Sequence, residues 1–200
     1  MAIKEMLQEG NEPRFDYRAF LAKHGGATVT KYSDKQTVYA QGDKADALYY
    51  IIGGSVKVTI YSEYGKEAVI GILTAGDFFG EGCLDGQLMR NSSIVTTSAS
   101  EIARIDISVV SRALDSDPNF AKLFMHFILD RNQKLQSDMI DQLFNSSEKR
   151  LARILLTLAN TGLGTQSNTI TMAINQEMLA TMVGTTRSRV NQFMNKFRKL

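Results

Sequence analysis

The segment from residue 76 to residue 93 combines glycines, one acid and one arginine in a spacing that suits a sugar phosphate. It contains Gly80-Glu81-Gly82-Cys83, and Arg90 lies ten residues after Gly80. Backbone N–H groups beside glycines and a guanidinium can both hold a phosphate group. A carboxylate can accept hydrogen bonds from ribose hydroxyls. Spacing alone also allows a structural ion pair between Glu81 and Arg90, so both interpretations stay open at this point.

The C-terminal end shows a second pattern with a chemical meaning. Asn175 is a good N-cap for a short helix over 176–182, and Gly184 lies in a tight turn before a last helix that begins after Thr186. Helix, glycine turn and helix is the order of a helix-turn-helix. In the last helix, helical spacing places one apolar face at Val190, Phe193, Met194 and Phe197.

The opposite face of this last helix and its first turn are polar and basic, including Ser188, Gln192, Asn195 and Lys199. Such a face suits base edges and phosphates in the major groove of DNA. The alternative is an ordinary amphipathic terminal helix. The candidate DNA-binding residues are Thr186, Arg187, Ser188, Arg189, Asn191, Gln192, Asn195 and Lys196.

Charge favours the DNA interpretation because it is unevenly distributed. The 200 residues carry a net charge of +2. Residues 148–200 hold eight Lys or Arg and two acids, a net +6, whereas the rest holds 15 basic and 19 acidic residues, a net −4. A basic end on an acidic body indicates a polyanionic partner for that end, although a solvated charged helix would look similar.

The part of the chain before these helices changes from a helical sequence pattern to a pattern of short strands. Residues 14–23 predict a short helix, and residues 27–107 alternate short apolar runs with glycine-containing turns. Ser55–Tyr61 alternates strictly, which predicts one face for Val56, Val58 and Ile60. Further strands are expected over 68–73, 93–99 and 102–107. Many short strands with frequent turns predict a small antiparallel barrel or sandwich.

A long helix is predicted from Pro118 to about Asn145, with Asp117 as its N-cap. Long helices with an apolar stripe often pair with another chain, which predicts a homodimer through 118–145; the alternative is packing on the chain's own barrel. Arg131, Asp138 and Gln142 interrupt the stripe. Its apolar positions are Phe120, Phe124, Phe127, Leu135, Met139 and Leu143.

Ser146-Ser147 is expected to cap another helix over 148–160, which ends at 161–164 and is followed by a short strand over 169–174. The single cysteine, Cys83, excludes an internal disulfide, a Cys-only zinc site and a Cys-ligated iron–sulfur cluster. Only His24 and His126 are present, so we expect no metal and no haem. No apolar run is long enough for a membrane span and no signal peptide is visible, which predicts a cytoplasmic protein without membrane contact.

The order of these motifs resembles the cyclic AMP receptor protein (Crp/Fnr) family of transcription regulators over nearly the whole chain. The segments that carry the resemblance are 41–58, 65–67, 76–81, 148–155 and 184–199. The resemblance implies an α+β fold with a cyclic-nucleotide-binding β-roll, a double-stranded β-helix or jelly roll. A dimerisation helix and a winged-helix-type helix-turn-helix follow. The implied domains are 1–117, 118–145 and 146–200, and the implied protein is not an enzyme.

The resemblance also implies a ligand and its residues. Cyclic AMP is favoured as the effector, with cyclic GMP possible. Glu81 would hold the ribose 2′-hydroxyl and Arg90 the cyclic phosphate. The backbone of Gly80, Gly82 and Cys83 would assist. The remaining implied contacts are an extra phosphate contact from Asn91 or Ser92, and base-facing positions at Arg131, Leu135 and Gln136.

For DNA, the resemblance implies a palindromic operator, a contact with RNA polymerase and base reading by Arg187, Ser188 and Gln192. Ser188 replaces an acid of the best-known members, which predicts a shifted operator preference. The chain stops at Leu200, where family members usually continue into a β-hairpin, so a truncated wing is expected. Two alternatives remain open. One is a regulator of this type with another effector or none, and the other is a nucleotide-binding module without DNA function.

Overall fold

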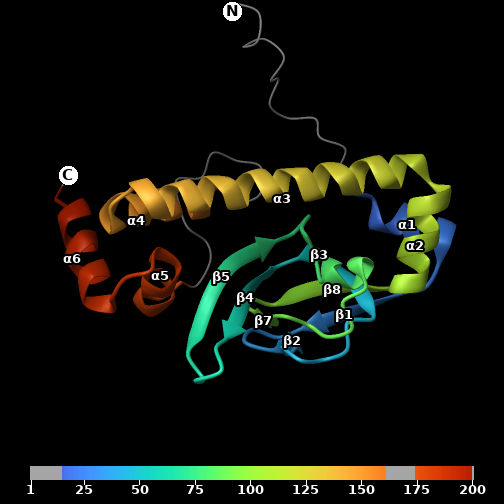
Figure 1. Ribbon diagram of the computed structural model, residues 1–200, viewed down its shortest axis with the longest axis horizontal. Helices are drawn as coiled ribbons and strands as arrows, with labels where there is room; N and C mark the ends of the chain where they lie inside the picture. Colours follow the sequence, from blue (N-terminus) through green and yellow to red (C-terminus); the bar gives the residue numbers. More distant parts are fainter. Residues whose placement is uncertain (1–14, 161–173, 200) are drawn as a thin grey trace, which may run out of the picture.

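The computed structural model describes residues 15–160 and 174–199 (Figure 1). A lobe of β-strands lies at one end and a small helical lobe at the other, and one long helix, α3 (Pro118–Phe144), runs along both. The expected end of a helix at 161–164 and the strand at 169–174 fall outside the described residues, apart from Ile174. Within the described residues, no helix has the length and apolar character needed to cross a membrane.

The β lobe consists of two four-stranded antiparallel sheets, in the orders β1-β8-β3-β6 and β2-β7-β4-β5. This arrangement confirms the expected antiparallel barrel or sandwich. Because strands from both ends of the lobe's sequence pair with one another, the loop after β6 is brought beside β2 and β4. The strands are β1 (Ala27–Tyr32), β2 (Thr37–Tyr39), β3 (Ala47–Gly53), β4 (Ser55–Tyr61), β5 (Glu67–Thr74), β6 (Phe78–Phe79), β7 (Ser93–Thr96) and β8 (Ser100–Asp106).

Strand β4 departs from the strict alternation that its sequence predicts. Its register with β5 shifts between Val58 and Thr59, which places both side chains in the interior. Thr59 is fully buried, and Ile60 is only half-buried. A β-bulge adds one residue to a strand and turns the following side chains to the other face, which explains the difference.

Two short helices, α1 (Tyr17–His24) and α2 (Ile107–Ser116), cover the β lobe together with the first half of α3 (Figure 1). Helix α1 begins later than the sequence predicts, because the Asp16 carboxylate accepts hydrogen bonds from the backbone N–H groups of Arg18 and Ala19. Stacked and tilted aromatic rings form the core beneath these helices: Phe15, Phe20, Tyr50, Phe78, Phe120 and Phe124.

The long helix begins and ends close to its predicted limits, but its apolar residues do not form one continuous contact. Phe120 and Phe124 are buried against the β lobe. Leu135, Met139 and Leu143 are 60%, 63% and 66% exposed. The second half of the helix continues over β4 and β5 toward the helical lobe (Figure 1), and its apolar residues are not part of the hydrophobic core of the β lobe.

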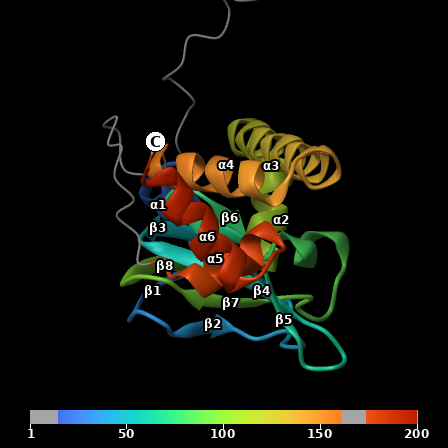
Figure 2. The same cartoon turned by 90° about the vertical axis from the view of Figure 1, so that its left-hand side faces the viewer.

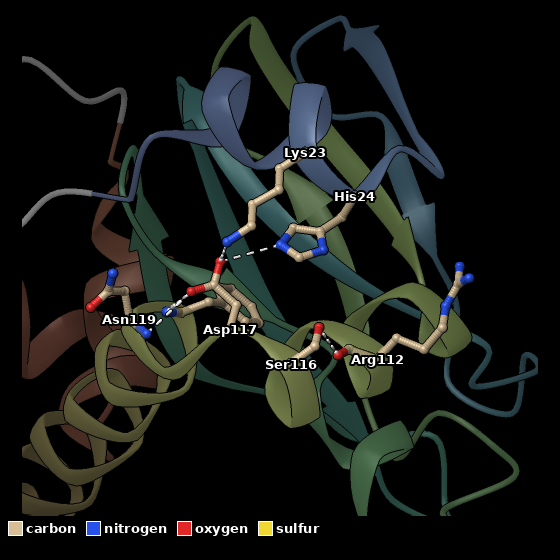
Figure 3. Close-up of polar contacts among 7 residues, drawn as sticks. Lys23, His24, Arg112, Ser116, Asp117 and Asn119 are labelled. Atoms are coloured by element: carbon tan, nitrogen blue, oxygen red, sulfur yellow. Dashed lines mark hydrogen bonds and ion pairs between the residues drawn. The ribbon is translucent and has the colours of Figure 1, made fainter.

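Asp117 joins α1 to the beginning of α3 (Figure 3). Its carboxylate accepts hydrogen bonds from the backbone N–H groups of Asn119 and Phe120, as expected for an N-cap. The same side chain lies 2.7 Å from the Lys23 ammonium and 3.3 Å from His24 Nε2. The hydrogen bond from Lys23, with smaller effects from His24 and the Phe120 backbone, holds the pKa of Asp117 well below its ordinary value.

We expect Asp117→Asn to lower the melting temperature slightly at neutral pH and Asp117→Ala to lower it by a few degrees. Asparagine keeps the N-cap but loses the charge, and solvent screens the contact with the exposed Lys23. Since the folded pKa is lowered, the carboxylate stabilises the fold above about pH 4 and loses this effect under acid. Thermal melts of the three proteins from pH 7 down to the lowest pH at which the chain still folds test this; a difference between the unmodified protein and Asp117→Asn that does not shrink as the pH falls below about 4 contradicts the ionic role.

The helical lobe contains α4 (Ser147–Asn160), α5 (Gln176–Val183) and α6 (Arg187–Phe197), which pack around a shared core (Figure 2). Asn175 and Thr186 cap α5 and α6 as predicted. Gly184 ends α5 with a φ of +69°, a left-handed conformation that favours glycine. Helix α6 ends at Phe197 rather than running on to Leu200 as predicted. The core of the helical lobe is formed by Leu151, Leu158, Leu179, Ala180, Val183 and Val190.

Contacts with β5 and with the end of α3 hold the helical lobe in position. Ile72 of β5 packs against the core of this lobe, and α5 lies directly on β5. The Arg150 guanidinium donates hydrogen bonds to the carbonyl oxygens of Asn145, at 2.9 Å, and Val183, at 2.8 Å. Arg150 therefore connects the end of α3 to the turn between α5 and α6.

Candidate functional site

A cavity of about 210 Å³ lies in the β lobe where the loop after β6 meets β2, β4 and α3. Most of the residues that the sequence analysis selected for ligand binding line it: Gly80, Glu81, Gly82, Asn91, Ser92 and Arg131. Residues from opposite ends of the β lobe's sequence and from α3 thus meet in one place. The fold brings together the acid, the glycines and one arginine.

Gly80 turns the chain from β6 into a short 3-10 helix, η1 (Glu81–Asp85). Its φ of +80° lies in the left-handed region, where a side chain is strained. A Cβ at this position would lie 2.6 Å from Arg90 Nη1. Glycine is therefore required here both for the turn and for the close approach of the arginine.

Arg90 lies immediately behind the wall of this cavity and is only 5% exposed. Its Nη1 donates a hydrogen bond to the Gly80 carbonyl oxygen at 2.9 Å, and Nη2 donates to the Ala47 carbonyl oxygen at 2.7 Å. Its guanidinium also lies over the ring of Tyr39, 4.5 Å from the centroid.

Two features of Arg90 favour an anionic ligand. Among the described residues, its buried Nε atom has no hydrogen-bond partner, and no carboxylate lies within ion-pair distance. A buried cation without an anionic partner is costly, and two carbonyl oxygens and an aromatic face compensate for it only in part. The donor set therefore fits a phosphate, which would supply both the charge and the missing acceptor.

Glu81 does not pair with Arg90, so the structure contradicts the alternative of a structural ion pair between these two residues. Its Oε1 atom lies 3.7 Å from Nη2 of Arg131 on α3, and the Glu81 side chain is 31% exposed. Arg131 Nη1 also donates to the Phe78 carbonyl oxygen at 3.3 Å. The acid of the cavity is thus connected to the long helix.

Six lining residues were absent from the sequence-based selection; four of them are apolar, and the two with polar side chains are Gln87 and Tyr39. Gln87 lies within the glycine-rich segment itself, so its position between Gly80 and Arg90 was a usable signal. Tyr39 comes from β2, and no local signal connects it to that segment. Burial raises the pKa of Tyr39 to about 12, although nearby Arg90 and Ser92 oppose this, so the phenol stays protonated at neutral pH.

Three other selected residues lie outside the cavity lining. Cys83 is buried, and burial raises the pKa of its thiol, which keeps the sulfur protonated and unreactive. Leu135 and Gln136 are exposed on α3, in the second half of the helix. Within one chain they contact no part of this cavity.

The candidate DNA-facing residues gather on the free side of α6 and at its N-terminus, and all of them are exposed. Thr186 accepts a hydrogen bond from the Arg189 backbone N–H, and the Arg189 guanidinium lies 5.8 Å from the Phe193 ring centroid. Arg187 and Ser188 open the helix and point away from the core formed around Val190.

Some of these side chains already have partners in the protein. Lys196 Nζ lies 2.7 Å from a carboxylate oxygen of Glu148 on α4. Gln176 of α5 donates a hydrogen bond to the Asn191 side chain at 3.4 Å. Arg187, Ser188 and Gln192 make no such side-chain contact within the described residues, which leaves them available for a partner.

Comparisons with known proteins agree with this arrangement. Residues 29–117 match the family model of the cyclic nucleotide-binding domain, and residues 149–200 match that of the Crp-like helix-turn-helix domain. The chain is 34% identical over 172 residues to the cAMP-activated global transcriptional regulator CRP of Pasteurella multocida, which covers 83% of this chain and 80% of the relative. The chain belongs to the Crp/Fnr family of transcription regulators.

A further relative and two solved structures are also similar to this chain. The CRP-like cAMP-activated global transcriptional regulator of Mycobacterium tuberculosis is 29% identical, with 80% of this chain and 73% of the relative covered. The c-di-GMP responsive regulator CLP of Xanthomonas campestris has the same fold, with a TM-score of 0.72, 21% identity and coverage of 91% and 90%. FixK2 of Bradyrhizobium japonicum has a TM-score of 0.75 at 16% identity, with coverage of 86% and 85%.

Membership in the Crp/Fnr family confirms the predicted fold, an α+β arrangement of β-roll, long helix and helix-turn-helix. It also confirms that the chain is a cyclic-nucleotide-binding-domain regulator of transcription rather than an enzyme. The described residues contain no cluster of three or more metal-ligating side chains.

Proposed function

We propose that this Crp/Fnr protein is a homodimer whose binding to a palindromic operator is controlled by a cyclic nucleotide, with cyclic AMP favoured. The observation that supports this most directly is the buried Arg90 guanidinium, with an unpartnered Nε and no carboxylate beside it. Cyclic AMP is favoured because the named CRP relatives are cAMP-activated, and cyclic GMP or another effector is the alternative. The CLP protein, which is c-di-GMP responsive, shows that the fold also serves another nucleotide.

The proposed ligand contacts follow the geometry of the cavity. Arg90 would hold the cyclic phosphate, with Asn91 or Ser92 adding a contact and the backbone N–H groups of Gly80, Gly82 and Cys83 assisting. The Glu81 carboxylate would accept hydrogen bonds from the ribose and exchange part of its contact with Arg131 for them. The base would lie toward α3, near Arg131, Leu135 and Gln136.

The exposed apolar residues on the second half of α3 support the dimer. Exposed apolar surface of this extent on a helix usually marks an interface. A second copy of α3 would cover Leu135, Met139 and Leu143 and bring Leu135 and Gln136 near the nucleotide. We propose residues 1–117 as the effector domain, 118–145 as the dimer helix and 146–200 as the DNA-binding domain.

In such a dimer, two α6 helices would enter successive major grooves about 34 Å apart. Ligand binding would shift the population toward the dimer state that fits DNA. Arg187, Ser188 and Gln192 would read bases, with Ser188 altering the operator preference. A contact with RNA polymerase and a cytoplasmic location complete the proposal.

Calorimetry of the full chain with cyclic AMP, cyclic GMP and c-di-GMP tests the effector. We expect one cyclic AMP per chain, bound more tightly than the other two nucleotides. A mobility-shift assay on a palindromic site, with and without the bound nucleotide, then tests the coupling. Absence of binding to all three nucleotides by the folded protein would contradict the proposed control.

We expect Arg187→Ala to weaken DNA binding by roughly 1–3 kcal/mol, about 5- to 150-fold, at operators that carry the base read by Arg187. Operators with another base at that position should be affected less. The physical reason is the loss of a bidentate contact from an exposed arginine at the start of α6. Lys196→Ala is the matched control. It removes an exposed charge that is already paired with Glu148, so it should weaken all sequences equally and slightly.

Binding to a randomised set of operators, selected and sequenced for each variant, measures both effects. A uniform loss of affinity for Arg187→Ala, with unchanged sequence preference, would assign Arg187 to phosphate contact instead.

A further inference from the structure

A second and much larger cavity, the outer cavity, is lined by residues of α1, β3, β6 and the part of α3 from Asn119 to Lys134. Its volume is about 910 Å³. Cavities of this size with a mainly apolar lining are typical of small-molecule sites. Its walls are formed largely by aromatic rings, namely Phe15, Phe20, Tyr50, Phe78, Phe120 and Phe127.

The charged residues around this cavity favour a negatively charged ligand group. Three of its four acids are already engaged. The Asp16 carboxylate accepts hydrogen bonds from backbone N–H groups of α1, and the Asp77 carboxylate accepts one from the Thr74 backbone N–H at 2.7 Å. Asp117 forms an ion pair with Lys23. Asp130 is the remaining acid among the lining residues.

The cations of α3 are less engaged than these acids. Lys122 and Lys134 lie along the cavity and are exposed, and His126 lies between them on the same face of the helix. Within the described part of the chain, Lys122 and His126 make no ion pair. Lys134 has an acidic residue one turn away on each side, Asp130 within the cavity lining and Asp138 further along α3.

From the aromatic walls and these cations we propose that the outer cavity binds a small aromatic or otherwise apolar carboxylate. Its apolar body would lie among the aromatic rings, and its carboxylate would face the lysines of α3. Apolar surface would supply most of the affinity, and the lysines would select the sign of the charge.

Arg131 connects this site to the nucleotide cavity, because it lines both. Its guanidinium donates to the Phe78 carbonyl oxygen and lies 3.7 Å from Glu81. A carboxylate in the outer cavity would compete with Glu81 for this guanidinium. This second step rests on the proposed function: the carboxylate and the nucleotide should change one another's affinity by the same factor.

Calorimetry of the full chain without nucleotide tests the site, with 2-naphthoate as the probe and the protonated amine 2-naphthylmethylammonium as the charge-reversed control. We expect 2-naphthoate to bind one molecule per chain, at least about tenfold more tightly than the amine. Ala19→Trp should weaken 2-naphthoate at least about tenfold, because Ala19 lies on the exposed face of α1 and its side chain lines the cavity. The double variant Lys122→Glu and Lys134→Glu should have a similar effect by reversing the charge.

Arg90→Ala is the control that separates the two sites, because Arg90 does not line the outer cavity. It should leave 2-naphthoate binding unchanged, whether or not the protein binds cyclic nucleotide. Binding of 2-naphthoate by a chain that binds no nucleotide would retain the outer site and reject only the proposed effector.

The outer site would be overturned by no binding of 2-naphthoate, by equal binding of the amine, by no effect of Ala19→Trp, or by binding that appears only after residues 1–14 are removed. This last result would identify residues 1–14 as the occupant. Binding that weakens as the protein self-associates would identify a second copy as the occupant and would also reject the proposal.

Discussion

Replacing Arg90 with alanine is expected to weaken cyclic nucleotide binding on the order of 100-fold or more, while the protein stays folded. The guanidinium is 5% exposed and has an unpartnered Nε, so a bound phosphate would gain strong charge-assisted hydrogen bonds in a site shielded from water. Two such bonds at about 1.5–3 kcal/mol each account for this factor. Calorimetry of the purified variant with cyclic AMP measures it.

Two further variants make this result interpretable. Arg112→Ala removes an exposed arginine of α2 (Figure 3). Its guanidinium donates only to the Ser108 carbonyl oxygen of its own helix among the described residues, so the variant should bind nucleotide like the unmodified protein. Arg90→Lys keeps the charge but loses the planar geometry of the guanidinium. Its affinity for the nucleotide should therefore fall between that of Arg90→Ala and that of the unmodified protein. A folded Arg90→Ala variant with unchanged affinity would mean that the phosphate binds elsewhere.

Met139→Glu is expected to raise the dimer dissociation constant at least about 100-fold. Met139 is 63% exposed in the middle of the apolar part of α3, where the proposed partner helix would cover it. In a two-fold symmetric dimer each substitution occurs twice, and both carboxylates would be buried near one another without a cation. Sedimentation equilibrium over a range of protein concentrations measures the change.

Ser137→Glu is the matched control for Met139→Glu. It adds the same charge to the same helix, at an exposed position that helical spacing places nearly opposite Met139, so it should leave the association unchanged. Equal effects of the two variants would indicate a general charge effect rather than an interface. Equal association of Met139→Glu and the unmodified chain would place the dimer contact outside this stripe.

Local signals in the sequence were sufficient for much of the fold. Asp117 and Pro118, Asn175, Gly184 and Thr186 set helix ends through interactions within a few residues, so they could be located without tertiary information. Glycine spacing likewise identified Gly80 and the arginine ten residues later as candidate ligand contacts.

Interactions between distant segments required the structure. The bulge in β4 depends on its pairing with β5, so periodicity alone placed Thr59 on the wrong face. The apolar positions of α3 follow helical spacing throughout, and only contact with the hydrophobic core of the β lobe separates buried Phe120 from exposed Met139.

The candidate site shows the same division. The sequence by itself determined the chemistry of the site, because an acid, flexible glycines and an arginine occur within one short segment. Only the tertiary structure decided the partners: Glu81 meets Arg131 of α3, Tyr39 of β2 covers Arg90, and Arg131 lines two cavities. The reason is physical, since side-chain chemistry is a property of each residue, whereas burial and pairing depend on which distant elements the fold brings together.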